Sequence, residues 1–134
     1  MEWTVREIAR MVDLSAVRAD SDETEVRTLA DMAIEYQCVC ASTLPSFTPL
    51  LKELLADEPQ IHVGGNVGFP SGGATRSMKI AAARELVQMR CDELDMVINV
   101  TWLKAGRDDR VRDDIEAAGE RGLELPGKRP HVGL

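Results

Sequence analysis

The 134-residue sequence lacks the features that mark several classes of protein. Its three cysteines form an odd set without a disulfide framework, and Cys38 and Cys40 have no further ligand at metal spacing, so we expect buried thiols. No apolar run approaches the roughly 18 residues that span a bilayer, and residues 1–7 contain no apolar signal core. A net charge of -7 disfavours binding to nucleic acid or to an anionic membrane. These absences predict a globular protein of the reducing cytoplasm, without nucleic acid or membrane as partners.

Motifs for several kinds of chemistry are missing as well. Residues 63–68, Val-Gly-Gly-Asn-Val-Gly, have neither the spacing of a dinucleotide-binding loop nor a P-loop lysine. His62 and His131 have no serine or cysteine partner that would indicate a catalytic triad. The segment 68–73 contains three glycines, and a plain strand-to-helix turn competes there with a phosphate site at the start of the next helix.

The chain does contain an alternation of helical and strand patterns. Asp13-Leu14-Ser15 is expected to end the first helix, and Thr4 with Glu7 and Asp22 with Glu25 match capping boxes. Helices are expected over residues 4–12, from 22, from 45, over 75–89 and over 108–118, and strands over 39–43, 61–67 and 93–100. Such alternation is typical of an α/β protein with a parallel sheet, either doubly wound or closed into a (β/α) barrel.

The last expected strand contains an acidic residue at a position where burial of an apolar residue would cost less free energy. Alternation along a strand places Asp95 on one face with Val97 and Asn99. The apolar residues of the opposite face are Leu94, Met96 and Ile98. Because the apolar face should pack against helices, Asp95 is expected to face a barrel interior or a cleft, where it could relay protons or pair with an ammonium group. The alternative is a solvated or capping aspartate at the beginning of the strand.

Covalent chemistry through an amine would require a lysine with a lowered pKa. The chain has four lysines, of which Lys52 and Lys79 are expected to be solvated on helices and Lys128 lies in the segment after residue 118 that departs from the helix–strand pattern. Lys104 follows the last strand, at the end of the sheet where barrel active sites lie, and is the lysine with the best placement for a nucleophile.

Residues 119–134 depart from the helix–strand pattern. They contain two prolines and a basic pair, which do not fit a buried parallel strand. The expected organisation is therefore a folded part over 1–118 and a divergent, disordered tail over 119–134.

Four motifs resemble the 2-deoxyribose-5-phosphate aldolase family of class I aldolases. They are residues 9–15 (Ala-Arg-Met-Val-Asp-Leu-Ser), 40–45 (Cys-Ala-Ser-Thr-Leu-Pro), 67–75 (Val-Gly-Phe-Pro-Ser-Gly-Gly-Ala-Thr) and 92–100 with Leu-Lys-Ala-Gly at 103–106. The last two are specific. The resemblance covers roughly residues 5–118 and implies a TIM barrel that is represented by about its first three βα units and an N-terminal helix.

The resemblance also implies an activity, which is the reversible Schiff-base cleavage of 2-deoxy-D-ribose 5-phosphate to glyceraldehyde 3-phosphate and acetaldehyde, without metal or cofactor. Asp95 matches the catalytic aspartate of the family, which takes part in the proton relay. Asp13 matches an active-site acid, while Ser42 and Phe69 match pocket positions.

The Schiff-base lysine of the family lies in a Lys-Thr-Ser-Thr-Gly context that this sequence does not contain. The sequence therefore predicts a partial aldolase, from a truncated or frameshifted gene, that is inactive alone. One alternative is a half-barrel that binds a sugar phosphate after association with itself or with a complementing chain. The other is a nonfunctional remnant.

Overall fold

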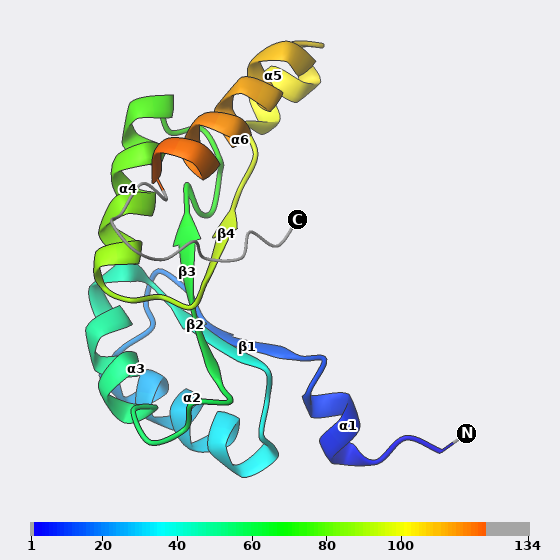
Figure 1. Ribbon diagram of the computed structural model, residues 1–134, viewed down its shortest axis with the longest axis vertical. Helices are drawn as coiled ribbons and strands as arrows, with labels where there is room; N and C mark the ends of the chain where they lie inside the picture. The colour runs from blue at the N-terminus through cyan, green and yellow to red at the C-terminus, as the bar shows by residue number, and fades with distance from the viewer. Residues whose placement is uncertain (1, 123–134) are drawn as a thin grey trace. The chain divides into compact units, whose positions relative to one another are not determined.

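A computed structural model describes residues 2–122, so the expected tail lies, from residue 123 on, outside the described residues. The elements in chain order are α1 (Val5–Ala9), β1 (Asp13–Ala16), α2 (Glu23–Tyr36), β2 (Cys40–Thr43), the 3-10 turn η1 (Pro45–Phe47), α3 (Thr48–Leu54), β3 (His62–Val67), α4 (Arg76–Gln88), β4 (Glu93–Met96), α5 (Val100–Lys104) and α6 (Asp108–Gly122) (Figure 1). The chain divides into two compact units, residues 1–65 and 66–134, and the boundary falls inside β3 rather than in a linker.

The strands form one sheet in the order β1-β2-β3-β4. β1 pairs with β2 and β2 with β3, both in parallel. At the other end of β3 the Val97 amide donates to the Val67 carbonyl at 2.9 Å, which joins the chain after β4 to β3. Parallel strands in sequence order, connected by helices, confirm the predicted α/β class.

The first unit has a core of apolar side chains between the strands and their helices. On α2 the residues Val26, Leu29, Ala30 and Ala33 are buried, as the helical spacing predicts. The helix begins at Asp22, whose side chain accepts from the Glu25 amide at 3.0 Å. The capping box is only half formed, because the Glu25 carboxylate binds Arg18 at 2.6 Å.

Two expectations for the first unit were wrong or incomplete. Residues Asp13–Ala16 do not merely end the first helix but form β1, so the expected first strand is the second and the described sheet has four strands rather than three. The segment alternates polar and apolar residues over just four positions, which is too short to indicate a strand, and its stability comes from parallel pairing with β2. The Thr4 capping box is confirmed, but α1 ends at Ala9 rather than near Val12.

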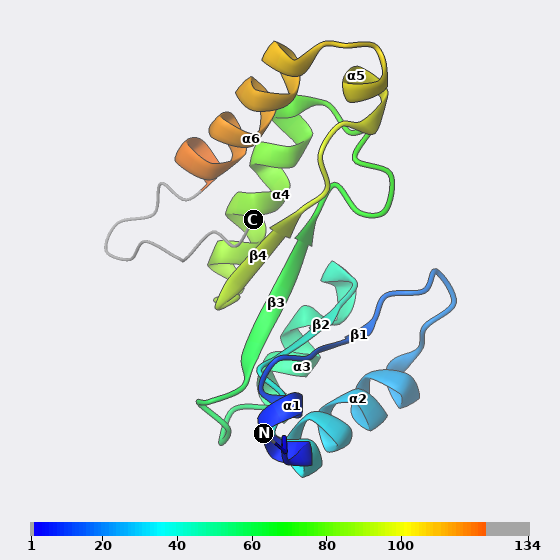
Figure 2. The ribbon, with the colours of Figure 1, turned by 90° about the vertical axis from the view of Figure 1, so that its right-hand side faces the viewer.

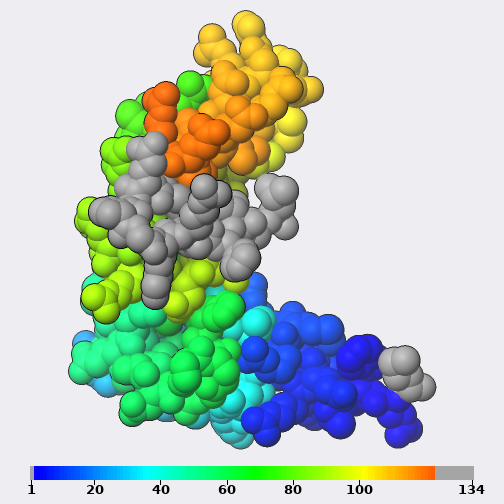
Figure 3. Space-filling view, in the orientation of Figure 1, coloured from blue at the N-terminus to red at the C-terminus, as the bar shows by residue number. Residues whose placement is uncertain are grey.

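Most apolar side chains of the N-terminal segment remain exposed. Trp3, Val5, Ile8 and Met11 are 58%, 68%, 48% and 61% exposed, and Ala9 is the buried residue of α1. The space-filling view shows this blue segment standing out from the rest of the first unit (Figure 3). A cluster of exposed apolar groups of this kind is a candidate contact surface.

The second unit is built around α4 and α6, which lie side by side in both ribbon views (Figures 1 and 2). They approach so closely that a Cβ atom placed on Gly122 would lie 2.5 Å from the Ala83 Cβ. α6 continues to Gly122, four residues beyond its predicted end at Ala118. β4 ends at Met96 rather than at Val100.

No helix within the described residues is long and apolar enough to cross a membrane. Cys38, Cys40 and Cys91 are buried, which confirms the expectation for them.

Candidate active site

In the first unit, two of the predicted site residues lie on one face of the sheet. The register pairs Asp13 with Cys40 and Ser15 with Ser42, so Asp13 and Ser42 project to the same side, two positions apart. Asp13 opens β1 and is exposed, whereas Ser42 is only 7% exposed. The opposite face carries Leu14, Ala41 and Val63, which belong to the core with α2 and α3. These strands therefore have one face with polar residues and one face that packs against helices.

A row of small residues crosses this polar face. Ser15, Ser42 and Gly64 are neighbours in the register of β1, β2 and β3. A Cβ atom on Gly64 would lie 3.1 Å from the Cys40 Sγ and 3.2 Å from the Ser42 Cβ, so a larger residue would crowd the row. Because these side chains are small, they leave space above the sheet next to Ser42.

In the second unit, Asp95 lies on β4 with a half-buried side chain. Leu94, on the other face of the strand, is 7% exposed and belongs to a core cluster against which Met96 packs. Asp95 is therefore on the face that does not pack against helices, as the alternation predicts.

Asn99 does not extend this face as a strand residue. It is 4% exposed and caps α5, where its Oδ1 accepts from the Trp102 amide at 3.1 Å and from the Thr101 hydroxyl at 2.6 Å. Asparagine is a favoured N-cap residue, and this local competition ends the strand before it reaches Val100.

Phe69 lies in the loop after β3 and is 40% exposed. The Phe69–Pro70 peptide bond is cis, and Gly68 and Gly72 flank the pair with φ values of 72° and 68°. A side chain on Gly72 is excluded by space as well as by φ, because its Cβ would lie 1.9 Å from the Ile98 carbonyl oxygen. The loop that carries Phe69 therefore packs directly on the backbone that follows β4.

The second unit also contains a buried ion pair that the sequence interpretation missed. Lys79 Nζ lies 2.7 Å from Asp114 Oδ2, and both side chains are 0% exposed. The same ammonium donates to the Val97 carbonyl at 2.9 Å. Asp114 Oδ1 has no hydrogen-bond partner among the described residues.

The expectation that Lys79 is solvated on its helix is therefore wrong. Lys79, Ala83 and Leu86 are the buried residues of α4 and recur at i, i+4 and i+7. Asp114 shares the buried face of α6 with Val111 and Ala118. The spacing on the two helices, considered together, was a usable signal, because it placed one lysine and one aspartate on two apolar faces.

The other lysines differ in placement from Lys79. Lys104 occupies the last turn of α5 and is exposed, and Lys52 is half-buried on α3. Lys128 lies outside the described residues. Between residues 2 and 122, no group of three or more His, Cys, Asp or Glu side chains is arranged to hold a metal.

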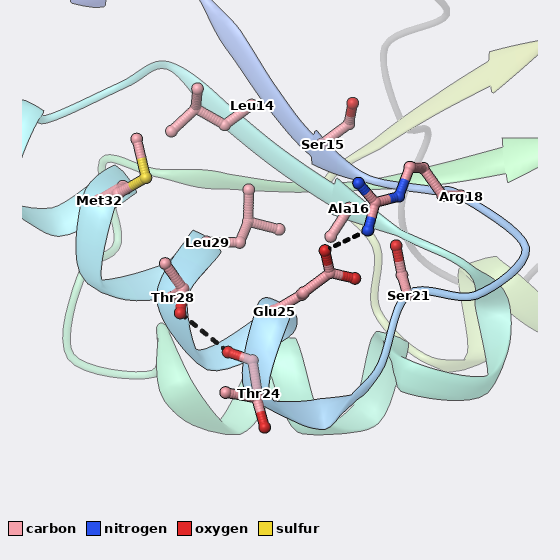
Figure 4. Close-up of a pocket in the computed structure, with 10 residues that line it drawn as sticks. All are labelled: Leu14, Ser15, Ala16, Arg18, Ser21, Thr24, Glu25, Thr28, Leu29 and Met32. Carbon is pink, nitrogen blue, oxygen red and sulfur yellow. Dashed lines mark hydrogen bonds and ion pairs between the residues drawn. The ribbon is translucent and has the colours of Figure 1, made fainter.

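A groove of about 330 Å³ lies elsewhere in the first unit, between β1 and α2 (Figure 4). Leu14, Ala16, Leu29 and Met32 supply much of its apolar lining, and the Arg18–Glu25 ion pair lies at one end. The groove contains none of the four predicted site residues. Its position on the helix-covered side of β1 favours packing of another polypeptide segment over catalysis.

Comparisons with known proteins identify relatives but no matching family model. A deoxyribose-phosphate aldolase of Sinorhizobium medicae is 46% identical over 123 residues, which are 92% of this chain and 50% of the relative. The enzyme of that name from Klebsiella pneumoniae is 38% identical over 130 residues, 96% of this chain and 52% of the relative. The chain thus spans about half the length of the curated relatives it matches.

Solved structures give the same result for the fold. A protein from Coccidioides immitis, assigned to the deoxyribose-phosphate aldolases, matches with a TM-score of 0.85 and 25% identity, over 96% of this chain and 49% of that one. The Aeropyrum pernix deoxyribose-phosphate aldolase, described as tetrameric, matches with a TM-score of 0.66 and 22% identity over 83% and 50%.

The sheet order and these neighbours define the first half of a TIM-barrel aldolase, which decides between the barrel and the doubly wound sheet. The chain belongs to the deoxyribose-phosphate aldolase family and corresponds to the amino-terminal half of its members.

Proposed function

We propose that this chain supplies the acid–base half of a deoxyribose-phosphate aldolase site and acts on a 2-deoxy sugar phosphate. The observation that supports this most directly is the position of Asp95. It lies in the specific run at residues 92–100, on the face of β4 opposite the helix-packed Leu94. A half-buried carboxylate on such a face suits proton transfer.

The chemistry that the family resemblance implies uses an amine and a proton relay. The amine adds to the C1 aldehyde of the open-chain sugar and loses water, which gives a protonated Schiff base. The C3 hydroxyl then loses its proton, the C2–C3 bond breaks, and its electron pair enters the Schiff base, which leaves an enamine and releases glyceraldehyde 3-phosphate. Protonation at C2 and hydrolysis release acetaldehyde. We assign Asp95 to the relay and Asp13, Ser42 and Phe69 to the pocket.

The amine is proposed to come from a second polypeptide that corresponds to the carboxyl-terminal half of the relatives. Lys79 is unsuited, because its ammonium is buried against Asp114 and would have to lose both its proton and its ion pair. Lys104 is exposed in the last turn of α5, whereas a Schiff-base lysine is usually enclosed in an apolar pocket or placed beside another cation. The 134-residue chain alone is therefore proposed to be inactive.

Three buried cysteines, with no disulfide among them, support a reducing compartment, and we propose the cytoplasm.

The experiment mixes the chain with the carboxyl-terminal half of the Sinorhizobium medicae relative and measures release of glyceraldehyde 3-phosphate. We expect cleavage by the mixture and none by the chain alone. Asp95→Asn should lower kcat by about 100-fold or more, because a positioned proton-transfer group contributes roughly that factor. The matched control is Asp92→Asn, an exposed acid just before β4, which should leave the rate unchanged. Equal effects of the two variants would overturn the assignment.

A second proposal is that the chain is a binding module that associates through its first unit. The groove between β1 and α2 supports it, together with the outer edge of β1, which has β2 as its sole partner among the described strands. The occupant we propose is the last strand–helix unit of the same carboxyl-terminal half, with its strand parallel to β1. Met32→Glu should weaken that association, whereas Met78→Glu, on exposed α4 surface, should not. Size-exclusion chromatography of the mixtures would contradict the proposal if both variants behaved alike.

A further inference from the structure

Three segments of the second unit converge on Lys79. Its ammonium binds Asp114 on α6 and the Val97 carbonyl just after β4. Its stem lies beneath the loop after β3, because a Cβ atom on Gly68 would approach the Lys79 Cε to 3.0 Å. The Lys79 side chain therefore contacts both the loop that contains Phe69 and the segment that follows Asp95.

The two backbone segments also contact each other. The Gly72 amide donates to the Gly68 carbonyl at 2.8 Å, which closes the loop that carries Phe69. Gly72 lies against the Ile98 carbonyl, and the Val97 amide donates to the Val67 carbonyl at 2.9 Å. The loop after β3 and the chain after β4 thus form one interlocked layer, and Lys79 lies against it from the side of α4.

Stability alone gives no reason for a lysine at this position. Well-packed apolar residues of similar volume commonly replace a buried ion pair without loss of stability. A methionine would fill much of the same space, but it cannot donate to the Val97 carbonyl. An ammonium can, and Asp114 then balances its charge, even though one Asp114 oxygen has no partner among the described residues.

We infer that Lys79 is a positioning residue, which holds the Phe69 loop and the chain after β4 in the arrangement that presents Phe69 and Asp95. The inference rests on the proposed function for its meaning and on the contacts of Lys79 for its geometry. Asp114 serves as the counter-ion that keeps the ammonium in place, and Lys79 itself is assigned no contact with substrate.

The test compares amide hydrogen exchange in the 134-residue chain with that in three variants. Lys79→Met removes the ammonium and leaves Asp114 buried without its partner, which destabilises the whole unit and masks a local effect. The double variant Lys79→Met/Asp114→Leu removes both charges and should recover most of the lost stability. Leu86→Ala, a buried apolar residue on the same helix, is the control for general loosening of the unit.

The amides of Gly72 and Val97 report the interlocked layer, and those of Met89 and Cys91 report the opposite end of α4. In the stable double variant we expect exchange at Gly72 and Val97 to accelerate by about tenfold relative to Met89 and Cys91. Leu86→Ala should not produce that selective change. Unchanged protection at Gly72 and Val97, or an equal change at all four amides, would reduce Lys79 to a purely structural role and overturn the inference.

The outcome is independent of the aldolase assignment, because no ligand is present. Cleavage of 2-deoxy-D-ribose 5-phosphate by the unmodified complemented mixture tests the proposed function separately. In that mixture the double variant should lower kcat more than it raises KM, since displaced Phe69 and Asp95 affect the reacting arrangement. If neither kcat nor KM changes in the double variant, despite a selective effect on exchange, the positioning role is contradicted.

Discussion

The interiors of the two units differ in composition. The first unit buries an apolar cluster that draws on α1, α2, α3 and three strands, with Val26, Leu51 and Val63 at its centre. The second unit buries a smaller apolar cluster around Leu86 and Leu94, and adds a fully buried lysine–aspartate pair and close glycine contacts. An apolar core tolerates gradual change, whereas a buried ion pair fails when either partner is lost.

This difference also separates the predicted site residues. Asp13 and Ser42 lie on a sheet face whose other side is ordinary apolar core. Phe69 and Asp95 lie on segments that contact the buried Lys79 side chain. The more polar interior lies where the family resemblance places the catalytic acid, and functional sites commonly retain such costly groups.

The largest expected effect is loss of one partner of the buried pair. Lys79→Met should destabilise the second unit by about 4 kcal/mol, because Asp114 is left buried and uncompensated. The double change Lys79→Met/Asp114→Leu should recover most of this loss. Urea denaturation followed by the fluorescence of Trp102, in a Trp3→Phe background, measures both. Additive losses in the double variant would show that the pair is not coupled.

The matching change in the first unit is Leu51→Ala, which truncates a side chain that is 0% exposed. We expect a loss of about 3 kcal/mol from lost burial and the cavity left behind. Thermal denaturation followed by circular dichroism measures it. A loss below 1 kcal/mol would indicate a core that collapses easily, and the contrast between the units would then weaken.

Much of the first unit follows from its sequence. The buried face of α2 is visible as Val26, Leu29, Ala30 and Ala33, and the cap at Asp22 is visible as well. β1 is not, because an alternation of four residues is too short to indicate a strand, and the segment becomes one through hydrogen bonds to β2. Non-local pairing of this kind leaves little trace in a local pattern.

Less of the second unit could be predicted from its sequence. The strand face of Asp95 is predicted by alternation, whereas the early end of β4 depends on the Asn99 cap. The pairing of Lys79 with Asp114 joins residues 35 positions apart, and a single helical pattern favours the exposed interpretation of a lysine. The spacing of both residues on apolar faces was informative only when the two helices were considered together.

A smaller effect compares the caps of the long helices in the two units. Asp22→Ala should cost about 1 kcal/mol, because the Asp22 side chain satisfies the Glu25 amide at 3.0 Å. Thr75→Ala should cost less, since Thr75 Oγ1 lies 3.4 Å from the Met78 amide. Urea denaturation of each variant measures the cost, and a larger loss at Thr75 would reverse the expected order.

The smallest effect concerns pH. Burial raises the pKa of the Cys38 thiol above its usual 9.0; the Arg10 guanidinium opposes this and the Asp13 carboxylate adds to it. Above pH 9.0 the unfolded chain therefore loses the thiol proton before the folded chain does, so stability should fall as pH rises toward the folded-state pKa. Cys38→Ala should flatten this decline in urea denaturation across that range. An unchanged slope would assign the decline to other groups.

The most direct test of the central claim is borohydride trapping with 2-deoxy-D-ribose 5-phosphate, followed by mass spectrometry of both polypeptides. The claim is that this chain provides the acid and its partner provides the amine. We predict no adduct on the isolated chain and, in the mixture with the carboxyl-terminal half of the Sinorhizobium medicae relative, one adduct on a lysine of that half. An adduct on Lys104 or Lys79 of this chain would contradict the account.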